Sequence, residues 1–418
     1  MQEAQGTMTF SEPASNNWQK NLYAIFIAEL LVMAGFSFVF PFMPLYIEKL
    51  GNYSYSQAAF WAGIAEGVCG IAMFLSAPLW GLLADRTGRK PMVLRAIFGS
   101  AVVVALIAIS PNVPFLIIMR FFQGVLSGTV AAASALVAAT TPREKRPFAM
   151  GLLMTGIYVG NSCGPLIGGL SADKFGYETT FFISAIALAA GGFVVLFMVK
   201  EKFEPVKSSE RSSLGSMMRL AGSKEVLPLL IIQFALNAGP SMVGPIIPLF
   251  IQQLNPLGQA ATEAGIAFTL AGIIAALSSV VAGRLTTRFP LKTILVFSCL
   301  GTCLTYLAPM TASNVTQLTI YIALRGLLNG GILTAGYALL SLSVSPAQQG
   351  VVFGLGQSAS SLGGGVGPTI GGALGSSLGF RNVFGFTAGM YLFTTLLVVK
   401  AIPKHAGETA ETTPKGSG

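Results

Sequence analysis

The chain has 418 residues, of which 53% are hydrophobic and only 10% are charged. A soluble domain usually carries about 25% charged residues, so these few charges could not cover the surface of a soluble protein of this size. The mean hydropathy is +0.70, and apolar stretches of about 20 residues recur along the whole chain. These features predict a polytopic α-helical membrane protein. The net charge of +9 is spread over the loops and does not form one patch, so it does not indicate nucleic-acid binding.

Residues suited to metal binding or nucleophilic chemistry are scarce. The single histidine, His405, lies in the polar tail, and all four cysteines lie inside apolar segments, at Cys69, Cys163, Cys299 and Cys303. Cysteines in such segments are typical of small buried apolar residues, not of disulfides or metal ligands. The sequence has neither a nucleophile–base pair in a loop nor a Gly-x-x-x-x-Gly-Lys-Ser/Thr phosphate loop. We therefore expect neither an enzyme nor an ATP-driven pump, and no metal or organic cofactor.

Twelve apolar segments, each long enough to cross a bilayer, follow one another along the chain. They are expected at residues 22–48, 57–84, 91–110, 113–138, 148–171, 177–199, 226–253, 263–288, 291–310, 316–343, 349–374 and 381–402. Residues 1–21 form a polar lead-in without the apolar core of a cleavable signal peptide. The sequence therefore predicts an N-terminal six-helix bundle over 22–199, a charged, solvated loop over 200–225, a second bundle over 226–402, and a disordered polar tail over 403–418.

The distribution of basic residues predicts which side of the membrane each loop faces, because cytoplasmic loops are enriched in Lys and Arg. With the N-terminus in the cytoplasm, 19 of the 25 Lys and Arg residues fall on the cytoplasmic side. Only Lys49, Lys174 and Arg381 fall on the other side, and the remaining three lie within spans. We therefore expect both termini to be cytoplasmic.

The two halves of the chain are repeats of one another, offset by about 203 residues. Four matches occur in the same order: Gly35–Ile47 with Gly239–Ile251, Gln57–Ala65 with Gln259–Ala267, Arg120 with Arg325, and Gly164–Gly169 with Gly367–Gly372. The repeat predicts an all-α membrane protein with twelve transmembrane helices in two six-helix bundles, related by a pseudo-two-fold axis. Secondary transporters use this architecture and bind substrate between the bundles near the bilayer midplane. A channel can also be built from repeats, but alternating access is what two rocking bundles provide.

Several segments resemble motifs of the major facilitator superfamily, and the resemblance covers the whole chain. The run Gly81-Leu-Leu-Ala-Asp85-Arg86-Thr-Gly88-Arg89-Lys90 is similar to the signature loop between its spans 2 and 3. The segment Gly156–Gly169, which includes Gly160, Gly164, Pro165 and Gly168, resembles the span-5 motif of its drug–proton antiporters. The segment Arg120-Phe-Phe-Gln123-Gly124 resembles their span-4 motif. Gly35 with Pro41 and Pro44 resembles the span-1 motif of the twelve-span, bacterial multidrug exporter group.

This resemblance implies a monomeric, multi-pass protein of the cell membrane that exports hydrophobic, often cationic compounds by alternating access. Protons would be the coupling ion, and the partners would be small molecules and the lipid bilayer, with no nucleic acid. The alternative is a superfamily transporter of one defined metabolite, such as a sugar or a siderophore. The sequence motifs do not identify a substrate.

The loop motif at 81–90 has two interpretations. Gly81 and Gly88 allow close approach and positive φ, and Asp85 is the only acid among three basic residues, Arg86, Arg89 and Lys90. The resemblance implies that Asp85 pairs with basic groups and a helix end of the other bundle and latches the inward gate. Alternatively, the loop only sets topology through its positive charge. The second half has Thr287 at the position of this acid, so any latch is one-sided.

The span-5 motif predicts a packing surface. Four glycines recur at every fourth residue and so lie on one helix face: Gly156, Gly160, Gly164 and Gly168. Pro165 adds a bend, because its ring removes a backbone hydrogen bond. The resemblance implies that these residues and Gly169 form a hinge and a tight bundle interface. Ordinary helix packing explains the same pattern.

Three charged residues lie well inside spans of the first half, where charge is costly and commonly functional. At 1.5 Å per residue, Glu29 lies about 10 Å from the inner end of its span, and Glu66 and Arg120 lie about 13 and 10 Å from the outer ends of theirs. Glu66 and Arg120 should therefore approach each other. A carboxyl group beside an arginine stays charged, whereas one alone in apolar surroundings takes up a proton, and proton coupling needs both states. A permanent structural pair, or a counter-charge for cationic drugs, are the alternatives.

The second half lacks both acids, because Gln233 and Phe268 stand at the positions of Glu29 and Glu66. Arg325 therefore has no acidic partner and is expected to bind either backbone carbonyls or an anionic group of a substrate. Other polar residues inside spans are expected to face either a substrate cavity or a neighbouring helix: Gln123, Tyr158, Asn161, Gln233, Asn237, Asn329 and Gln357.

Overall fold

The computed structural model describes residues 18–201, 214–344 and 349–402, and every regular element within these ranges is a helix. The first half contains α1 (Trp18–Phe38), α2 (Met43–Gly51), α3 (Tyr55–Thr87), α4 (Arg89–Ala108), α5 (Val113–Leu126), α6 (Thr129–Thr140), the 3-10 turn η1 (Arg143–Lys145), α7 (Arg146–Phe175) and α8 (Tyr177–Met198). The second half contains α10 (Leu227–Val243), α11 (Ile247–Leu254), α12 (Ala260–Leu285), α13 (Leu291–Leu307), η3 (Ala308–Thr311), α14 (Val315–Leu342), α15 (Gln349–Leu378) and α16 (Phe380–Ala401).

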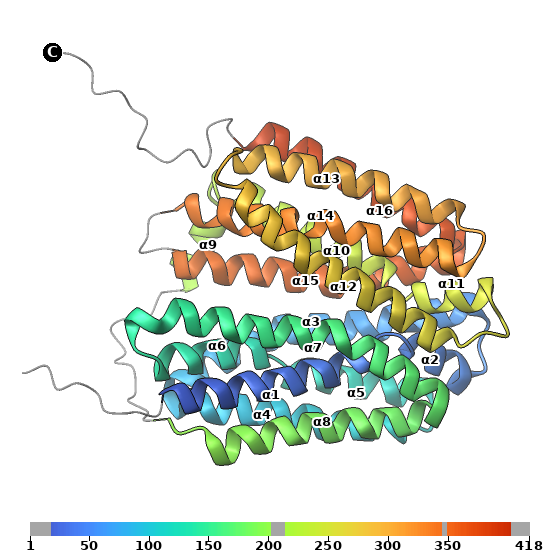
Figure 1. Ribbon diagram of the computed structural model, residues 1–418, viewed down its shortest axis with the longest axis horizontal. Helices are drawn as coiled ribbons and strands as arrows, with labels where there is room; N and C mark the ends of the chain where they lie inside the picture. The colour runs from blue at the N-terminus through green and yellow to red at the C-terminus, as the bar shows by residue number, and fades with distance from the viewer. Residues whose placement is uncertain (1–17, 202–213, 345–348, 403–418) are drawn as a thin grey trace, which may run out of the picture.

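The helices form two bundles that lie side by side, α1–α8 in one and α10–α16 in the other (Figure 1). Along the chain between the two bundles, the stretch expected to be a solvated loop contains an additional short helix, α9 (Leu214–Ala221), which contacts α15. The sequence prediction missed this helix because its eight residues are too few to stand out by periodicity. The two-bundle, all-helical fold itself is confirmed.

Ten segments are long and apolar enough to cross a membrane by length and composition. The two expected spans that do not reach this threshold are α7 and α15, each a single helix of 30 residues. Both are rich in glycine, which lowers their hydropathy without preventing them from packing lengthwise, α7 along α1 and α15 along α10. The structure therefore agrees with twelve helical spans.

Three of the expected continuous spans are broken. The first span divides into α1 and α2 at Pro41 and the seventh into α10 and α11 at Pro245, because proline lacks the N–H that a continuous helix needs. The fourth span divides into α5 and α6 at Gly128, whose φ of 109° lies in the left-handed region. Trp80 Nε1 donates to the carbonyl of Val125 at 2.6 Å and so satisfies a carbonyl freed at this break.

Helix packing fixes the register of the repeat for spans 2–4 and 8–10. Gly99 packs against Leu126, as Gly301 packs against Leu328. Similarly, the glycine of the span-4 motif packs on the backbone of Cys69, and Gly326 packs on that of Ala271. All four pairs correspond at an offset of 202.

The register corrects one prediction. At an offset of 202, Arg325 corresponds to Gln123 and Arg120 corresponds to Ile322, so matching the two arginines with each other was wrong by one helical turn. The sequence comparison aligned the only two arginines available, although the flanking glycines, Gly124 and Gly326, determine the helix crossing. The second bundle has therefore lost both members of the charge pair expected in the first.

The two bundles touch where α3 packs on α15 and α7 packs on α12. These contacts lie in the halves of the helices nearest α2 and α11, an end that we call the α2/α11 end. There, Gly63 packs on the backbone of Pro368 and Gly372, and Gly265 packs on that of Pro165. Towards the opposite end, where the chain passes from one bundle to the other, the bundles separate. A Cβ added at any of four glycines there would have no atom within 4 Å; these are Gly81, Gly151, Gly283 and Gly354.

The predicted orientation can be tested by thiol labelling. Cys163 is exposed, so the parent for this experiment should lack the native cysteines. We expect single cysteines at Asn52 and Asn314 to react with a membrane-impermeant maleimide in intact cells. A cysteine at Ser209, a position outside the described residues, should react only after permeabilisation. Labelling of position 209 in intact cells would contradict the model with both termini in the cytoplasm.

Candidate functional site

A partly buried ion pair lies inside the first bundle. Arg120 Nη2 on α5 is 2.8 Å from Glu66 Oε1 on α3, and Arg120 Nη1 donates to Gln123 Oε1 at 2.8 Å. The side chain of Arg120 is 7% exposed and that of Glu66 is 24% exposed. The prediction that Glu66 and Arg120 approach each other is confirmed. Gln123, expected only to face a cavity or a helix, completes this network.

The second acid, Glu29, lies on α1 and is enclosed within the first bundle. It is 1% exposed, and neither carboxyl oxygen has a hydrogen-bond partner among the described residues. An ionised carboxylate in such surroundings would cost many kcal/mol, so this geometry fits the neutral, protonated form. At 1% exposure, Glu29 is shielded from solvent in this conformation, which disfavours its use as a counter-charge for substrates in this state.

The loop motif holds its own bundle together in this conformation. The Glu201 carboxylate accepts from the backbone N–H groups of Arg89 and Lys90 at 2.8–3.0 Å and so caps the N-terminus of α4. Lys90 Nζ donates to the carbonyls of Leu196 and Val199 at the end of α8. The sequence prediction missed Glu201, which lies in the charged central segment far along the chain.

The glycines of the same motif behave differently from each other. Gly88 has a φ of 97°, as expected for the turn between α3 and α4. Gly81 has no close neighbour, so the close approach expected there does not occur in this conformation. Arg86 is exposed, and the side chain of Asp85 lies outside the described residues. The latch through Asp85 therefore stays a prediction.

The span-5 glycines lie on a packing face, as the sequence pattern predicts. On α7, four glycines pack on α1, at Gly156, Gly160, Gly164 and Gly168, while Gly169 packs on Ala261 of the second bundle. Pro165 lies within α7, and its carbonyl packs against Gly265. The α7 helix thus contacts its own bundle on one face and α12 on the other.

A carboxylate also joins the two bundles at the α2/α11 end. The Thr262 N–H, in the first turn of α12, donates to Asp173 Oδ2 of α7 at 2.7 Å. The side chain of Gln259, the N-cap residue of α12, makes no capping hydrogen bond to the backbone N–H groups at this end of the helix. A carboxylate is favourable here because the N-terminus of a helix carries partial positive charge. The sequence prediction missed Asp173, which lies beyond the span-5 motif.

The remaining polar candidates have mixed surroundings. Asn237 donates to Ser360 Oγ and to the Gln233 carbonyl, both at 3.0 Å, which is the interhelical role considered for it. Gln233 is 4% exposed, and its Nε2 has no partner among the described residues. Tyr158 and Gln357 are exposed within α7 and α15. Asn237 and Gln233 belong to the second bundle, apart from the Glu66 network.

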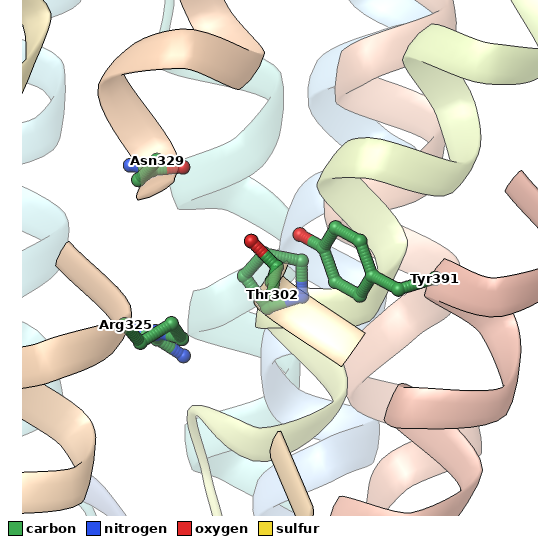
Figure 2. A pocket seen from close by; sticks show the side chains of 5 residues that line it. Thr302, Arg325, Asn329 and Tyr391 are labelled. Atoms are coloured by element: carbon green, nitrogen blue, oxygen red, sulfur yellow. The ribbon is translucent and has the colours of Figure 1, made fainter. Parts of the chain in front are cut away.

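Arg325 lies in the second bundle at a small cavity of about 40 Å³. Figure 2 shows Arg325 and Asn329, both from α14, on one side of this cavity, and Thr302 of α13 and Tyr391 of α16 on the other. Arg325 Nη1 donates to the Tyr306 hydroxyl at 2.7 Å. No carbonyl or carboxylate partner of Arg325 occurs within the described ranges, so the expected carbonyl cage is not seen there.

Comparison with known proteins identifies the family. The sequence matches the Major Facilitator Superfamily over residues 25–255 and 229–417. It is 35% identical to the multidrug resistance protein MdtG of Proteus mirabilis, over 92% of this chain and 96% of that protein. It is 34% identical to MdtG of Escherichia coli O1:K1, over 91% and 94%. The chain belongs to the major facilitator superfamily.

Solved structures of major facilitator proteins show the same fold at low sequence identity. A bacterial homologue of the human lysosomal transporter Spinster, in an inward-facing and occupied conformation, has a TM-score of 0.76 and 14% identity, over 93% of this chain and 97% of that one. The nucleoside transporter NupG has a TM-score of 0.76 and 13% identity, over 91% and 100%. Together with the family match and the helices long enough to cross a membrane, the sequence relatives show that the protein is a multi-pass membrane protein and a secondary transporter of this superfamily. The predicted resemblance is confirmed.

Proposed function

We propose that this major facilitator protein exports hydrophobic compounds, cationic ones among them, in exchange for protons. The relatives that it matches along almost their whole length are named multidrug resistance proteins. The observation that carries the proposal is the pair of acids in the first bundle, one in contact with Arg120 and one enclosed without a hydrogen-bond partner among the described residues. Such acids can take up and release protons, whereas the amide of Gln233 cannot.

The orientation proposed from the basic residues gives this conformation a place in the transport cycle. With both termini in the cytoplasm, the α2/α11 end is the outer end, and the bundles part towards the cytoplasm. Alternating access then requires α3 and α15, and α7 and α12, to separate at the outer end while the inner ends close. No cofactor is needed for this cycle beyond the protons themselves.

Inverted membrane vesicles test the proposed function. We expect a proton gradient, acid inside, to drive accumulation of a fluorescent cationic dye such as a bisbenzimide, and a protonophore to abolish it. Vesicles without the protein provide the background. If accumulation requires sodium or is indifferent to the protonophore, the proton-coupled export proposed here is wrong. Uptake of a sugar with no dye transport would favour the metabolite alternative.

The proposed latch gives a second, smaller prediction. Asp85→Asn keeps the size of the side chain and removes its charge, so the inner gate would lose a charge-assisted hydrogen bond. We expect normal insertion and a transport rate reduced about tenfold, as a loss of ~1.4 kcal/mol implies. Dye export at equal expression is the measurement. Parental activity for Asp85→Asn would leave the loop with a topological role only.

A further inference from the structure

The charge of Arg325 is not balanced within the second bundle. In the first bundle Arg120 is neutralised by Glu66 at 2.8 Å, but the corresponding positions of the second bundle hold the apolar Ile322 and Phe268. Arg325 replaces Gln123, one turn further along the helix. Within the described ranges no carboxylate pairs with it. A cation inside a transmembrane bundle is costly, so an arginine without an internal counter-charge needs one from outside.

The cavity is lined by polar groups that can form hydrogen bonds to a ligand. Thr302 is 2% exposed, and its hydroxyl lines the cavity without a hydrogen-bond partner among the described residues. Leaving a buried hydroxyl unpaired costs about 1–3 kcal/mol, which a ligand atom would recover. Asn329 contributes an amide one turn along α14 from Arg325 (Figure 2). These groups come from two helices, α13 and α14, and line one cavity.

Two tyrosines hold the guanidinium in place. The Tyr306 hydroxyl accepts from Arg325 Nη1, and the Arg325 guanidinium carbon lies 5.3 Å from the centroid of the Tyr306 ring. Tyr306 stacks on Tyr391 at 5.5 Å, and the Tyr391 hydroxyl donates to the Leu236 carbonyl at 3.3 Å. One edge of the guanidinium is thereby fixed, while its remaining N–H groups have no partner among the described residues. The arrangement orients a cation without neutralising it.

We propose that this cavity is an anion subsite, in which Arg325, Thr302 and Asn329 take a singly charged anionic group, such as a carboxylate, of a transported compound. The cavity of about 40 Å³ has room for roughly three waters or one small oxyanion head group. Arginine donors suit a carboxylate because two N–H groups can bind its two oxygens. This inference rests on the proposed export function and extends its substrates from cations to compounds with an anionic end. A free small anion, such as chloride, shares the same chemistry.

Binding of 1-naphthoate and of its uncharged analogue 1-naphthamide to the purified full-length protein tests the subsite. We expect calorimetry to give a Kd at least tenfold lower for naphthoate. In Arg325→Gln the two probes should bind equally, and in the isosteric Thr302→Val the preference should fall several-fold. Arg284→Gln, which removes an exposed arginine of α12, is the matched control and should keep the preference. Thr302→Val keeps the test valid if Arg325→Gln fails to fold.

The possible outcomes separate the sources of the anion. If chloride competes with naphthoate in the parent, the site accepts both a free anion and a substrate group. If chloride stabilises the parent but not Arg325→Gln, and naphthoate neither binds preferentially nor competes, the site holds a free anion and the substrate assignment is wrong. Equal binding of both probes without any chloride effect, or a preference that survives Arg325→Gln, overturns the proposal. Because no proton gradient is involved, a failure of proton-driven export leaves this result readable on its own.

Discussion

Replacing Glu66 by Gln should abolish uphill export while leaving downhill movement of substrate. The glutamine side chain would keep the length of the glutamate and a carbonyl oxygen to accept from Arg120, but it cannot take or release a proton near neutral pH. One proton moving down a total electrochemical gradient of 100 mV supplies about 2.3 kcal/mol, which supports a roughly 50-fold concentration ratio of a neutral compound; for a monovalent cationic dye exchanged one for one, only the pH part of the gradient drives the ratio. We expect this ratio to fall to unity. The measurement is substrate-induced proton release together with dye accumulation in inverted vesicles.

Two further variants decide between proton coupling and a permanent structural pair. Removing one partner of a fully buried ion pair typically costs about 3–5 kcal/mol, and a smaller loss is expected for this partly buried pair, so Glu66→Gln alone can reduce expression for reasons of stability. In the double variant Glu66→Gln, Arg120→Gln, no unpaired charge remains, and we expect a folded protein that equilibrates substrate without pumping it. Uphill transport by the double variant would show that the pair only holds the bundle together.

Glu29 requires a separate test, because the structure gives it different surroundings. It is 1% exposed and its carboxyl oxygens have no hydrogen-bond partner among the described residues, so Glu29→Gln replaces an enclosed carboxyl group by an amide of similar shape. We expect such a protein to fold normally. If Glu29 releases a proton in another conformation, its variant loses proton release. If the double variant Glu29→Gln, Glu66→Gln still pumps, protons move through other groups.

The fold could be predicted from the sequence, because hydrophobic length and the repeat of the two halves determine it. The breaks at Pro41 and Pro245 were less visible, since both prolines lie within continuous apolar runs. Within the site, the approach of Glu66 and Arg120 followed from their depths alone. Residues that act across long sequence separations could not be predicted in this way: Glu201 caps a helix 111 residues away, and Asp173 caps one 89 residues away. Such partners depend on the helix packing, which periodicity does not encode.

The register of the repeat also depends on helix packing that the sequence alone did not reveal, as Arg325 shows. Arg325 was matched to the wrong partner, because charge was a stronger signal along the sequence than the glycines that fix the helix crossing. Packing at Gly124 and Gly326 moves the correspondence by three residues, from Arg120 to Gln123. The consequence is functional, since it changes Arg325 from a repeated feature into one that the second bundle has by itself.

The paired glycines of the four interface helices predict how the conformational equilibrium can be moved. Each helix has at least one glycine at the α2/α11 end, where the bundles touch, and another with no atom within 4 Å at the other end; on α3, Gly63 is one of the first kind and Gly81 is the second. A Cβ at Gly63 would lie 2.9 Å from the Cα of Gly372, so Gly63→Val forces the backbones apart. At a cost of ~2 kcal/mol for overpacking, the population of this conformation should fall roughly 30-fold relative to the opposite one.

Spin labels on Asn52 and Leu257, both exposed and on opposite bundles at the α2/α11 end, report this change as a distance distribution. We expect Gly63→Val to lengthen the distance and to stop transport. Gly81→Val is the matched control on the same helix: it meets no atom in this conformation, so the distance should stay short. If Gly81 makes its close approach in the opposite conformation, as the loop motif implies, this variant also stops transport, but with the α2/α11 end closed. An unchanged distance in Gly63→Val, with transport intact, would show that these crossings do not separate during the cycle.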